Sequence, residues 1–248
     1  MLLNLIFFTL LLSLIIIVYV PHTNKLFLRQ FGLLSSGFVF FISVMLLNSY
    51  SLNTYYFQSL ILQKVDFEFL NINLVFGVDR VSLFFIALSA LLIFLCMLVI
   101  WDEVMLKEYI LILLSIDLFL IIIFSTLDLL FFYAFFEAIL IPMYLMIGLW
   151  GSRERKIRAA YLFFFYTLIG SLCMVVSLLY IYFKFGSLNY EYLYFIKLSF
   201  VEEYWLWLAF FMSFAVKIPL FPFHIWLPEA HVEAPSVGSI LLLSLIHI

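Results

Sequence analysis

The sequence predicts an all-α polytopic membrane protein of about eight transmembrane helices, the seventh of them broken. Of its 248 residues, 68% are hydrophobic and only 11% are charged, whereas a soluble domain carries about 25% charged residues. Long apolar runs alternate with short polar segments, and a helix needs about 20 apolar residues to cross a bilayer core. A proline-rich stretch follows the seventh run directly and predicts the break.

The apolar runs define the predicted spans in order. These spans are residues 2–20, 31–50, 81–101, 109–124, 127–150, 159–183, 204–216 and 236–248. The first run lacks a basic n-region and a small-residue cleavage site, so it is interpreted as a span and not as a signal peptide. The eighth run has 13 residues, which reach only about 20 Å of a core about 30 Å thick. The longest non-spanning stretch, 51–79, fits either a short hairpin or a surface helix.

Basic residues between the spans predict the orientation of the chain. Lys25 and Arg29 follow the first span, and an arginine-rich cluster at 151–158 follows the fifth. Both segments come after odd-numbered spans and therefore lie on one face, which the positive-inside rule assigns to the cytoplasm or matrix. The N-terminus is then expected on the opposite face.

The stretch 217–235, KIPLFPFHIWLPEAHVEAP, carries the most informative chemistry. Pro219 and Pro222 each remove a backbone donor and clash with the preceding turn, so the helix should break just after Lys217. Broken helices persist in lipid only where protein or trapped water satisfies the freed backbone groups. A lysine at such a break, at membrane depth, indicates an ion or proton path.

Glu137 is the natural partner of Lys217. It lies ten residues into the fifth span, about 15 Å deep and close to the midplane. Burial disfavours the charged forms of both side chains, while proximity favours them, so the pair can be poised to load and release a proton. The alternatives are a structural glutamate bonded inside the bundle and a lysine that snorkels to the interface.

His224 and His231 follow the break and suit a proton relay, because histidine titrates closest to physiological pH. Zinc binding is the rival interpretation, but no cysteine or third ligand accompanies them, and hydrogen bonds that fix the broken turn are a further alternative. Glu229 and Glu233 flank His231 and are assigned either secondary proton-transfer roles or loop fixing.

The remaining ionisable and special residues are assigned minor roles. Asp117, midway along the fourth span, is a possible secondary proton site, whereas Asp128 is expected to cap the helix that it precedes. Pro142 is expected either to kink the fifth span or to serve as a packing residue. The two cysteines lie in apolar runs and no nucleotide, flavin or iron–sulfur motif occurs, so the chain is expected to hold no metal and no redox cofactor, and no nucleic acid.

Two long motifs carry a resemblance to a known family. They are FFEAILIPMYLMIGLWGSRERKIRAAYLFFFYTLIGS at 135–171 and FAVKIPLFPFHIWLPEAHVEAPSVGS at 214–239, with weaker support from FGVDRVSLFF at 76–85. These segments resemble the chain 4 family of mitochondrial NADH–ubiquinone oxidoreductase, respiratory complex I, which is homologous to subunits of cation/proton antiporters. Members have 14 spans and two inverted five-helix repeats, each with one broken helix.

The resemblance implies a proton-translocating subunit of the enzyme, with no redox centre of its own. It implies helices 1–3 in residues 1–106 and the first antiporter-like repeat, helices 4–8, in 107–248. Glu137 is similar to the fifth-helix glutamate that tunes the lysine, Lys217 to the broken-helix lysine, and His224 and His231 to the two histidines that follow. Flavin, iron–sulfur clusters and quinone are then expected in other subunits, and structural phospholipid is compatible with this chain.

The chain departs from the family at Arg80, where relatives usually carry glycine, and beyond Ile248, where relatives carry an eighth-helix lysine and six more helices. We therefore expect other membrane-arm subunits and a second chain with the missing helices as partners, in the bilayer. The absence of an Arg- and Ser-rich leader favours an organelle-encoded protein of the mitochondrial inner membrane. The alternatives are a subunit of a stand-alone cation/proton antiporter and a scaffold that has lost pumping.

Overall fold

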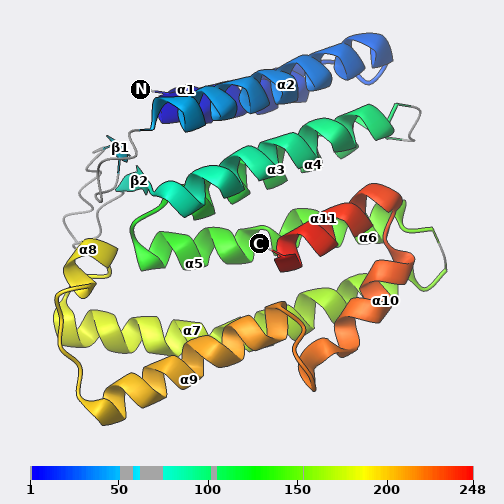
Figure 1. Ribbon diagram of the computed structural model, residues 1–248. Coiled ribbons are helices and arrows are strands. Elements are labelled where there is room, and N and C mark those ends of the chain that lie inside the picture. Colours follow the sequence, from blue (N-terminus) through cyan, green and yellow to red (C-terminus); the bar gives the residue numbers. More distant parts are fainter. Residues whose placement is uncertain (1, 51–57, 62–74, 102–104, 153, 248) are drawn as a thin grey trace. The chain divides into compact units, whose positions relative to one another are not determined.

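The computed structural model describes residues 2–50, 58–61, 75–101, 105–152 and 154–247. Within these ranges the chain is almost entirely helical, and six helical segments are long and apolar enough to cross a membrane. The principal helices are α1 Leu2–Tyr19, α2 Lys25–Ser49, α3 Arg80–Val99, α4 Leu106–Ser125, α5 Leu129–Ala138, α6 Leu140–Trp150, α7 Lys156–Phe185, α9 Phe200–Lys217, α10 Trp226–Glu233 and α11 Ser236–His247 (Figure 1). The predicted all-α polytopic membrane fold is confirmed.

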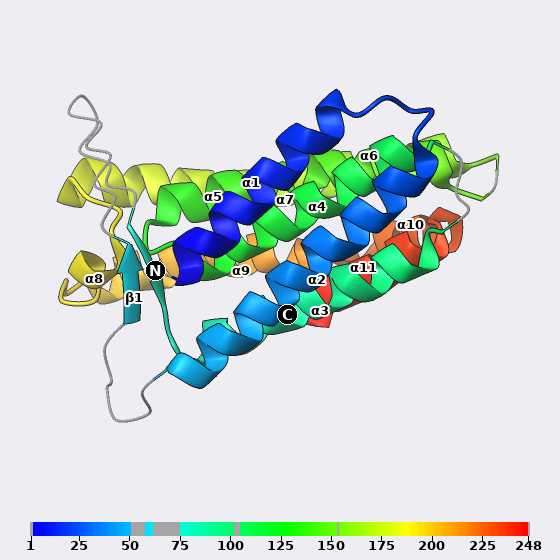
Figure 2. The ribbon, with the colours of Figure 1, turned by 90° about the horizontal axis from the view of Figure 1, so that it is seen from above.

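The described residues up to Thr126 form one compact unit of α1–α4. Helix α1 buries a stripe at helical spacing with Leu3, Ile6 and Leu10, whereas most residues of α4 are buried. Figure 2 shows α1 and α2 lying side by side, in agreement with their packing. The Lys107 ammonium donates a hydrogen bond of 2.8 Å to the Val18 carbonyl, which ties the start of α4 to the end of α1.

Residues 127–247 form the second unit, built on α7, the longest helix, and on α9, which packs along it. The far ends of these two helices are joined by an ion pair between Lys184 and Glu202, and the Tyr180 hydroxyl donates to the same carboxylate at 2.6 Å. A short helix, α8 Tyr190–Leu193, lies in the connection between them. The unit therefore holds α9 firmly at one end, while its other end is the predicted break.

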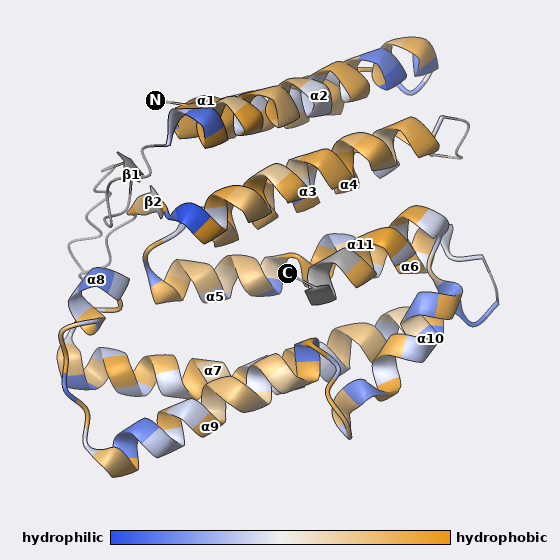
Figure 3. Cartoon of the chain, in the orientation of Figure 1, coloured by the Kyte–Doolittle hydropathy of each residue, from blue (hydrophilic) through white to orange (hydrophobic). Residues whose placement is uncertain are grey.

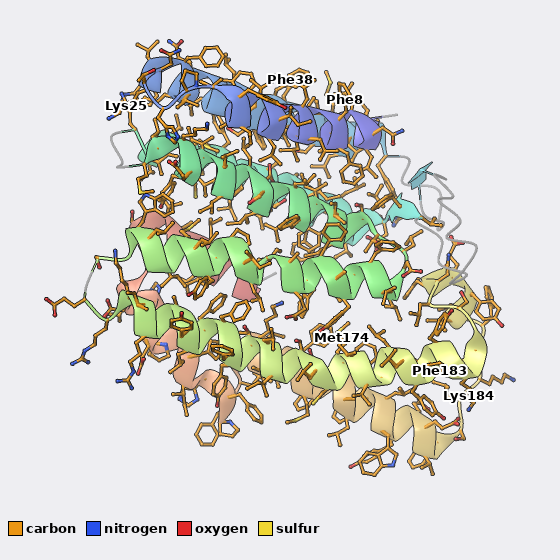
Figure 4. The ribbon with its side chains drawn as sticks, turned by 180° about the vertical axis from the view of Figure 1, so that it is seen from behind. Phe8, Lys25, Phe38, Met174, Phe183 and Lys184 are labelled. Atoms are coloured by element: carbon orange, nitrogen blue, oxygen red, sulfur yellow. The ribbon has the colours of Figure 1, made fainter. Side chains whose placement is uncertain are left out.

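The helices present apolar side chains outward, as lipid requires. Figure 3 shows hydrophobic colour along most of the long helices, and Figure 4 shows Phe8, Phe38 and Phe183 pointing away from the ribbon. Their exposed fractions are 65%, 49% and 82%. An exposed apolar surface on this scale is typical of a membrane protein.

The fifth span is divided into α5 and α6 at Ile139, and the seventh ends at Lys217. Pro142 explains the first interruption, because a proline ring clashes with the carbonyl four residues earlier, here that of Ala138. The seventh span gives way to irregular turns, a 3₁₀ turn η1 Phe223–Ile225 and then α10. The kink at Pro142 and the broken seventh helix are both confirmed.

Several predicted boundaries were wrong by a few residues. The stretch 184–203 was predicted as a loop, but α9 already starts at Phe200, because Ser199 and Glu202 form a capping box that fixes the first turn. Similarly, α2 starts at Lys25 inside the predicted loop, since long basic side chains at a helix end can snorkel to the interface.

Only part of the stretch 51–79 can be compared with its prediction. Strand β1 Gln58–Ile61 pairs antiparallel with β2 Phe76–Val78, which agrees with the hairpin alternative. Residues 51–57, 62–74 and 102–104, together with Met1, Arg153 and Ile248, lie outside the described residues. The two compact units divide after Thr126. The boundary predicted at 106/107 separates helices 1–3 from an internal repeat, which packing does not define, so it stays a prediction.

Candidate functional site

Lys217 is the last residue of α9, directly before the interruption that Pro219 and Pro222 impose. The chain turns there through backbone bonds from Ile218 N to the Phe214 carbonyl, 2.7 Å, and from Leu220 N to the Ala215 carbonyl, 2.9 Å. Trp226, buried at the start of α10, donates its indole N–H to the Val216 carbonyl at 2.8 Å. The irregular segment is thereby closed back onto the end of α9, so the position of the lysine is defined.

Glu137 faces Lys217 from the last turn of α5. The distance from Lys217 Nζ to Glu137 Oε1 is 3.8 Å, and the two side chains are 21% and 16% exposed. The predicted pairing of the two residues is confirmed. A direct charge-assisted hydrogen bond measures about 2.7–2.9 Å, so the pair is in electrostatic contact without that bond. Neither Glu137 oxygen has a hydrogen-bond partner among the described residues.

Phe136 supplies the remaining contacts of the ammonium group. Its backbone carbonyl accepts a hydrogen bond of 2.5 Å from Lys217 Nζ, and its ring centroid lies 3.1 Å from the same nitrogen. The carbonyl is in the last turn of α5, where helical carbonyls lose their intrahelical partners, and aromatic faces attract cations. Sequence reasoning missed this residue, because a phenylalanine among 32 carries no visible signal.

Gly170 on α7 allows α9 to approach closely beside the site. A Cβ at this position would lie 2.6–2.8 Å from three atoms of the Val216 side chain, which precedes Lys217. Ser171, next in sequence, is buried and interacts electrostatically with both Tyr133 and Glu137 of α5. Gly170 therefore sets how near α9 lies to α7, and Ser171 lies at the face of α5 that carries Tyr133 and Glu137. Sequence reasoning missed Gly170 and Ser171, although two adjacent small residues are visible inside the predicted span at 159–183.

The residues after the break lie apart from the pair. His224 is exposed and its ring contacts Phe221, with 5.7 Å between centroids. His231 is half-buried, and its Nδ1 has no hydrogen-bond partner within the described structure. No hydrogen bond or ion pair joins either histidine to Lys217 among the described residues, so the relay stays a prediction.

The two flanking glutamates differ in their surroundings. Glu229 lies 3.9 Å from Arg158 at the start of α7. Glu233 is buried at the end of α10, and its backbone carbonyl accepts from Ser152 N at 3.1 Å. This backbone bond agrees with the loop-fixing alternative for Glu233, while its side-chain Oε2 has no partner in the described ranges.

The two aspartates behave differently from each other. Asp128 accepts hydrogen bonds from Leu130 N at 2.8 Å and Phe131 N at 3.3 Å, so the predicted N-cap is confirmed. Asp117 is completely buried in α4, and both of its carboxyl oxygens lack a hydrogen-bond partner among the described residues. No group of three or more His, Cys, Asp or Glu side chains is placed to hold a metal ion in the part of the chain that the structure describes.

Fold and site together define a class, a helical membrane protein of the antiporter-like type with a lysine at a broken helix and a glutamate facing it. A sequence profile described as NADH:quinone oxidoreductase/Mrp antiporter, transmembrane region, matches residues 126–248. Residues 126–248 of the chain are thus similar to this family.

Named relatives are similar to most of the chain. The chain is 47% identical over 234 residues to NADH-ubiquinone oxidoreductase chain 4 of Chondrus crispus and 46% identical over 231 residues to that of Arabidopsis thaliana. These alignments cover 94% and 92% of the chain but only 47% and 46% of the relatives. The chain thus spans about half the length of the curated relatives that it matches.

Solved structures agree with the fold. The chain superimposes on a chain of respiratory complex I from Thermus thermophilus with a TM-score of 0.84 and 31% identity, covering 99% of this chain and 50% of the other. A chain of an archaeal membrane-bound sulfane sulfur reductase gives a TM-score of 0.78 at 17% identity, covering 98% and 39%. The second match bears on the fold alone.

Proposed function

We propose that this chain acts in a proton-translocating membrane subunit of a respiratory complex I enzyme, coupling NADH:ubiquinone electron transfer to proton pumping. The single observation that carries the proposal is the contact of 3.8 Å between Lys217 Nζ and Glu137 Oε1 at a helix break. The similarity of the chain to chain 4 of NADH-ubiquinone oxidoreductase supports the same function.

Lys217 is the proposed proton carrier, and Glu137 controls its charge. At 3.8 Å and an effective dielectric constant of about 20, the attraction between the two charges is about 4 kcal/mol. When Glu137 is charged and close, it stabilises the ammonium group together with the Phe136 carbonyl. When the carboxyl is neutralised or moves away, desolvation favours the neutral amine, and the proton leaves.

We assign His224 and His231 to the onward relay, and Asp117, Glu229 and Glu233 to secondary sites. Both histidines follow the break, His224 in η1 and His231 in α10. Imidazole exchanges protons near neutral pH. Water molecules have to connect them with Lys217, since His224 is exposed on this chain.

The chain is proposed to act as one subunit of a membrane complex in the mitochondrial inner membrane, encoded in the organelle. Flavin, iron–sulfur clusters and quinone are assigned to other subunits, and phospholipid to the exposed apolar helix faces. The helices that follow this region in the relatives have to come either from the same polypeptide or from the second chain expected above. Mass spectrometry and density of the purified complex distinguish these two sources.

The decisive experiment is proton pumping by the intact complex with Lys217→Ala. We expect NADH-driven proton uptake in sealed vesicles to fall at least tenfold, because removing one partner of a buried pair leaves the other uncompensated. Lys25→Ala, at an exposed lysine at the start of α2, is the matched control and should pump normally. Normal pumping by Lys217→Ala in an assembled complex would overturn the proposal.

The same preparation separates the alternatives. A stand-alone cation/proton antiporter would exchange ions without copurifying flavin and iron–sulfur clusters. A scaffold would assemble into the enzyme, and Lys217→Ala would leave its pumping unchanged.

A further inference from the structure

The hydroxyl groups of Tyr133 and Ser171, which have no role in the proposal above, lie next to Glu137. Tyr133 and Glu137 are four residues apart on α5 and therefore share one helix face. Ser171 of α7 is only 1% exposed and interacts with both of them. Tyr133 itself is half-buried, packed against the core formed around Met174 and Leu178.

The Ser171 hydroxyl uses only part of its capacity to form hydrogen bonds. Its hydroxyl donates to the Leu168 carbonyl at 2.8 Å, a bond within its own helix turn. A serine hydroxyl has one proton and two acceptor positions, and a bond to a carbonyl within the same helix is readily exchanged for another acceptor. Glu137, a buried acceptor beside it, has no hydrogen-bond donor in the described structure. A buried carboxyl group without a hydrogen bond costs free energy, so rotation of the Ser171 hydroxyl toward Glu137 is favourable.

We propose that Ser171 is a rotating hydroxyl that links Tyr133 to Glu137 and conducts protons to the carboxylate. In one concerted step a hydronium ion gives a proton to Tyr133 Oη, the phenolic proton passes to Ser171 Oγ, and the serine proton passes to Glu137 Oε. Each O–H bond broken is replaced by one formed, water is the product at the far end, and no electrons are transferred. The link deepens the proposed function, on which it depends.

The proposal explains why Glu137 is left without a donor in this structure. With Ser171 bonded to Leu168, the carboxylate is available to Lys217 at 3.8 Å. When the hydroxyl rotates toward Glu137, it supplies the proton that neutralises the carboxylate. Loading of Glu137 and release from Lys217 are thereby coupled through one side chain.

The test uses Ser171→Ala, Ser171→Thr and Tyr133→Phe in the intact complex. We expect Ser171→Ala and Tyr133→Phe to lower the rate of proton pumping by about tenfold or more and to narrow the pH range over which the complex pumps. Ser171→Thr keeps the hydroxyl and should retain the normal rate and the normal pH range. Ser177→Ala is the matched control, because Ser177 is also buried on α7 and donates to the Met174 carbonyl at 2.7 Å. It should pump normally.

A second readout separates conduction from packing. The infrared carboxyl band that disappears in Glu137→Gln should shift in Ser171→Ala and return in Ser171→Thr. Normal pumping and an unshifted band in Ser171→Ala would overturn this inference alone, provided that Lys217→Ala still lowers pumping at least tenfold. Normal pumping by Lys217→Ala would instead overturn the proposed function.

Discussion

Replacing Gly170 by alanine tests whether the close approach of α7 and α9 positions the lysine. The added Cβ would lie 2.6 Å from Val216 Cβ and 2.7 and 2.8 Å from its two Cγ atoms. Ordinary carbon contacts begin at about 3.5 Å, so the helices must separate by about 0.9 Å at this point. Overpacking of this kind costs about 1–3 kcal/mol, which an assembled complex can withstand.

The displacement should weaken function more than assembly. Lys217 follows Val216 directly and would move with it away from α7. A misplacement of about 1 Å in a reacting group can lower a rate by about 100-fold, so we expect NADH-driven proton pumping to fall between about tenfold and about 100-fold. Pumping is measured in vesicles by the quenching of a pH-sensitive dye, and assembly is measured by native electrophoresis.

The chain offers a matched control and a compensating change. A Cβ at Gly148, in α6, would meet only the Ala160 Cβ, at 3.9 Å, so Gly148→Ala should pump normally. Adding Val216→Ala to Gly170→Ala removes the two Cγ contacts and should restore pumping in part. Normal pumping by Gly170→Ala, or a loss that Val216→Ala does not relieve, would refute the positioning argument.

Three further substitutions test neighbouring contacts. Glu137→Gln removes the attraction of about 4 kcal/mol and should abolish pumping while the complex still assembles; retained pumping would assign Glu137 a structural role. Trp226→Phe leaves the Val216 carbonyl unsatisfied at a cost of about 1–3 kcal/mol and should lower thermal stability by scanning calorimetry more than Trp205→Phe, at an exposed indole; equal stability would show that the bond does not hold the break. Asp117→Asn should lower the number of protons pumped per NADH, with an effect several-fold smaller than that of Lys217→Ala. An unchanged number of protons per NADH would show that Asp117 is not a proton-transfer site.

The main architecture could be predicted because lipid imposes strong rules on sequence. Apolar runs of about 20 residues predict spans, and Pro142 and Pro219 predict the two interruptions. Glu137 and Lys217 stand out because ionisable side chains are rare at membrane depth. Their pairing followed from matching depth and is present at 3.8 Å.

The finer parts of the site could not be predicted for a physical reason. Phe136 contributes a backbone carbonyl, which every residue possesses, and a ring that is indistinguishable in sequence from rings facing lipid. Gly170 matters through the position of Val216 on another helix, which no pattern within α7 encodes. The helix starts at Lys25 and Phe200 were missed because polarity was taken to mean loop, whereas capping and snorkelling extend helices past the apolar run.

The end of α9 has an electrostatic consequence of its own. The aligned peptide dipoles of a helix place roughly half a negative elementary charge at its C-terminus, and Lys217 is the last residue of α9. The Phe136 carbonyl adds a further negative pole within 2.5 Å of the ammonium group. Backbone dipoles thus supply much of the counter-charge that a cation in a hydrocarbon layer requires. This backbone contribution is fixed, so the charge of Glu137 is the part of the surroundings that changes, and it decides whether Lys217 keeps or releases its proton.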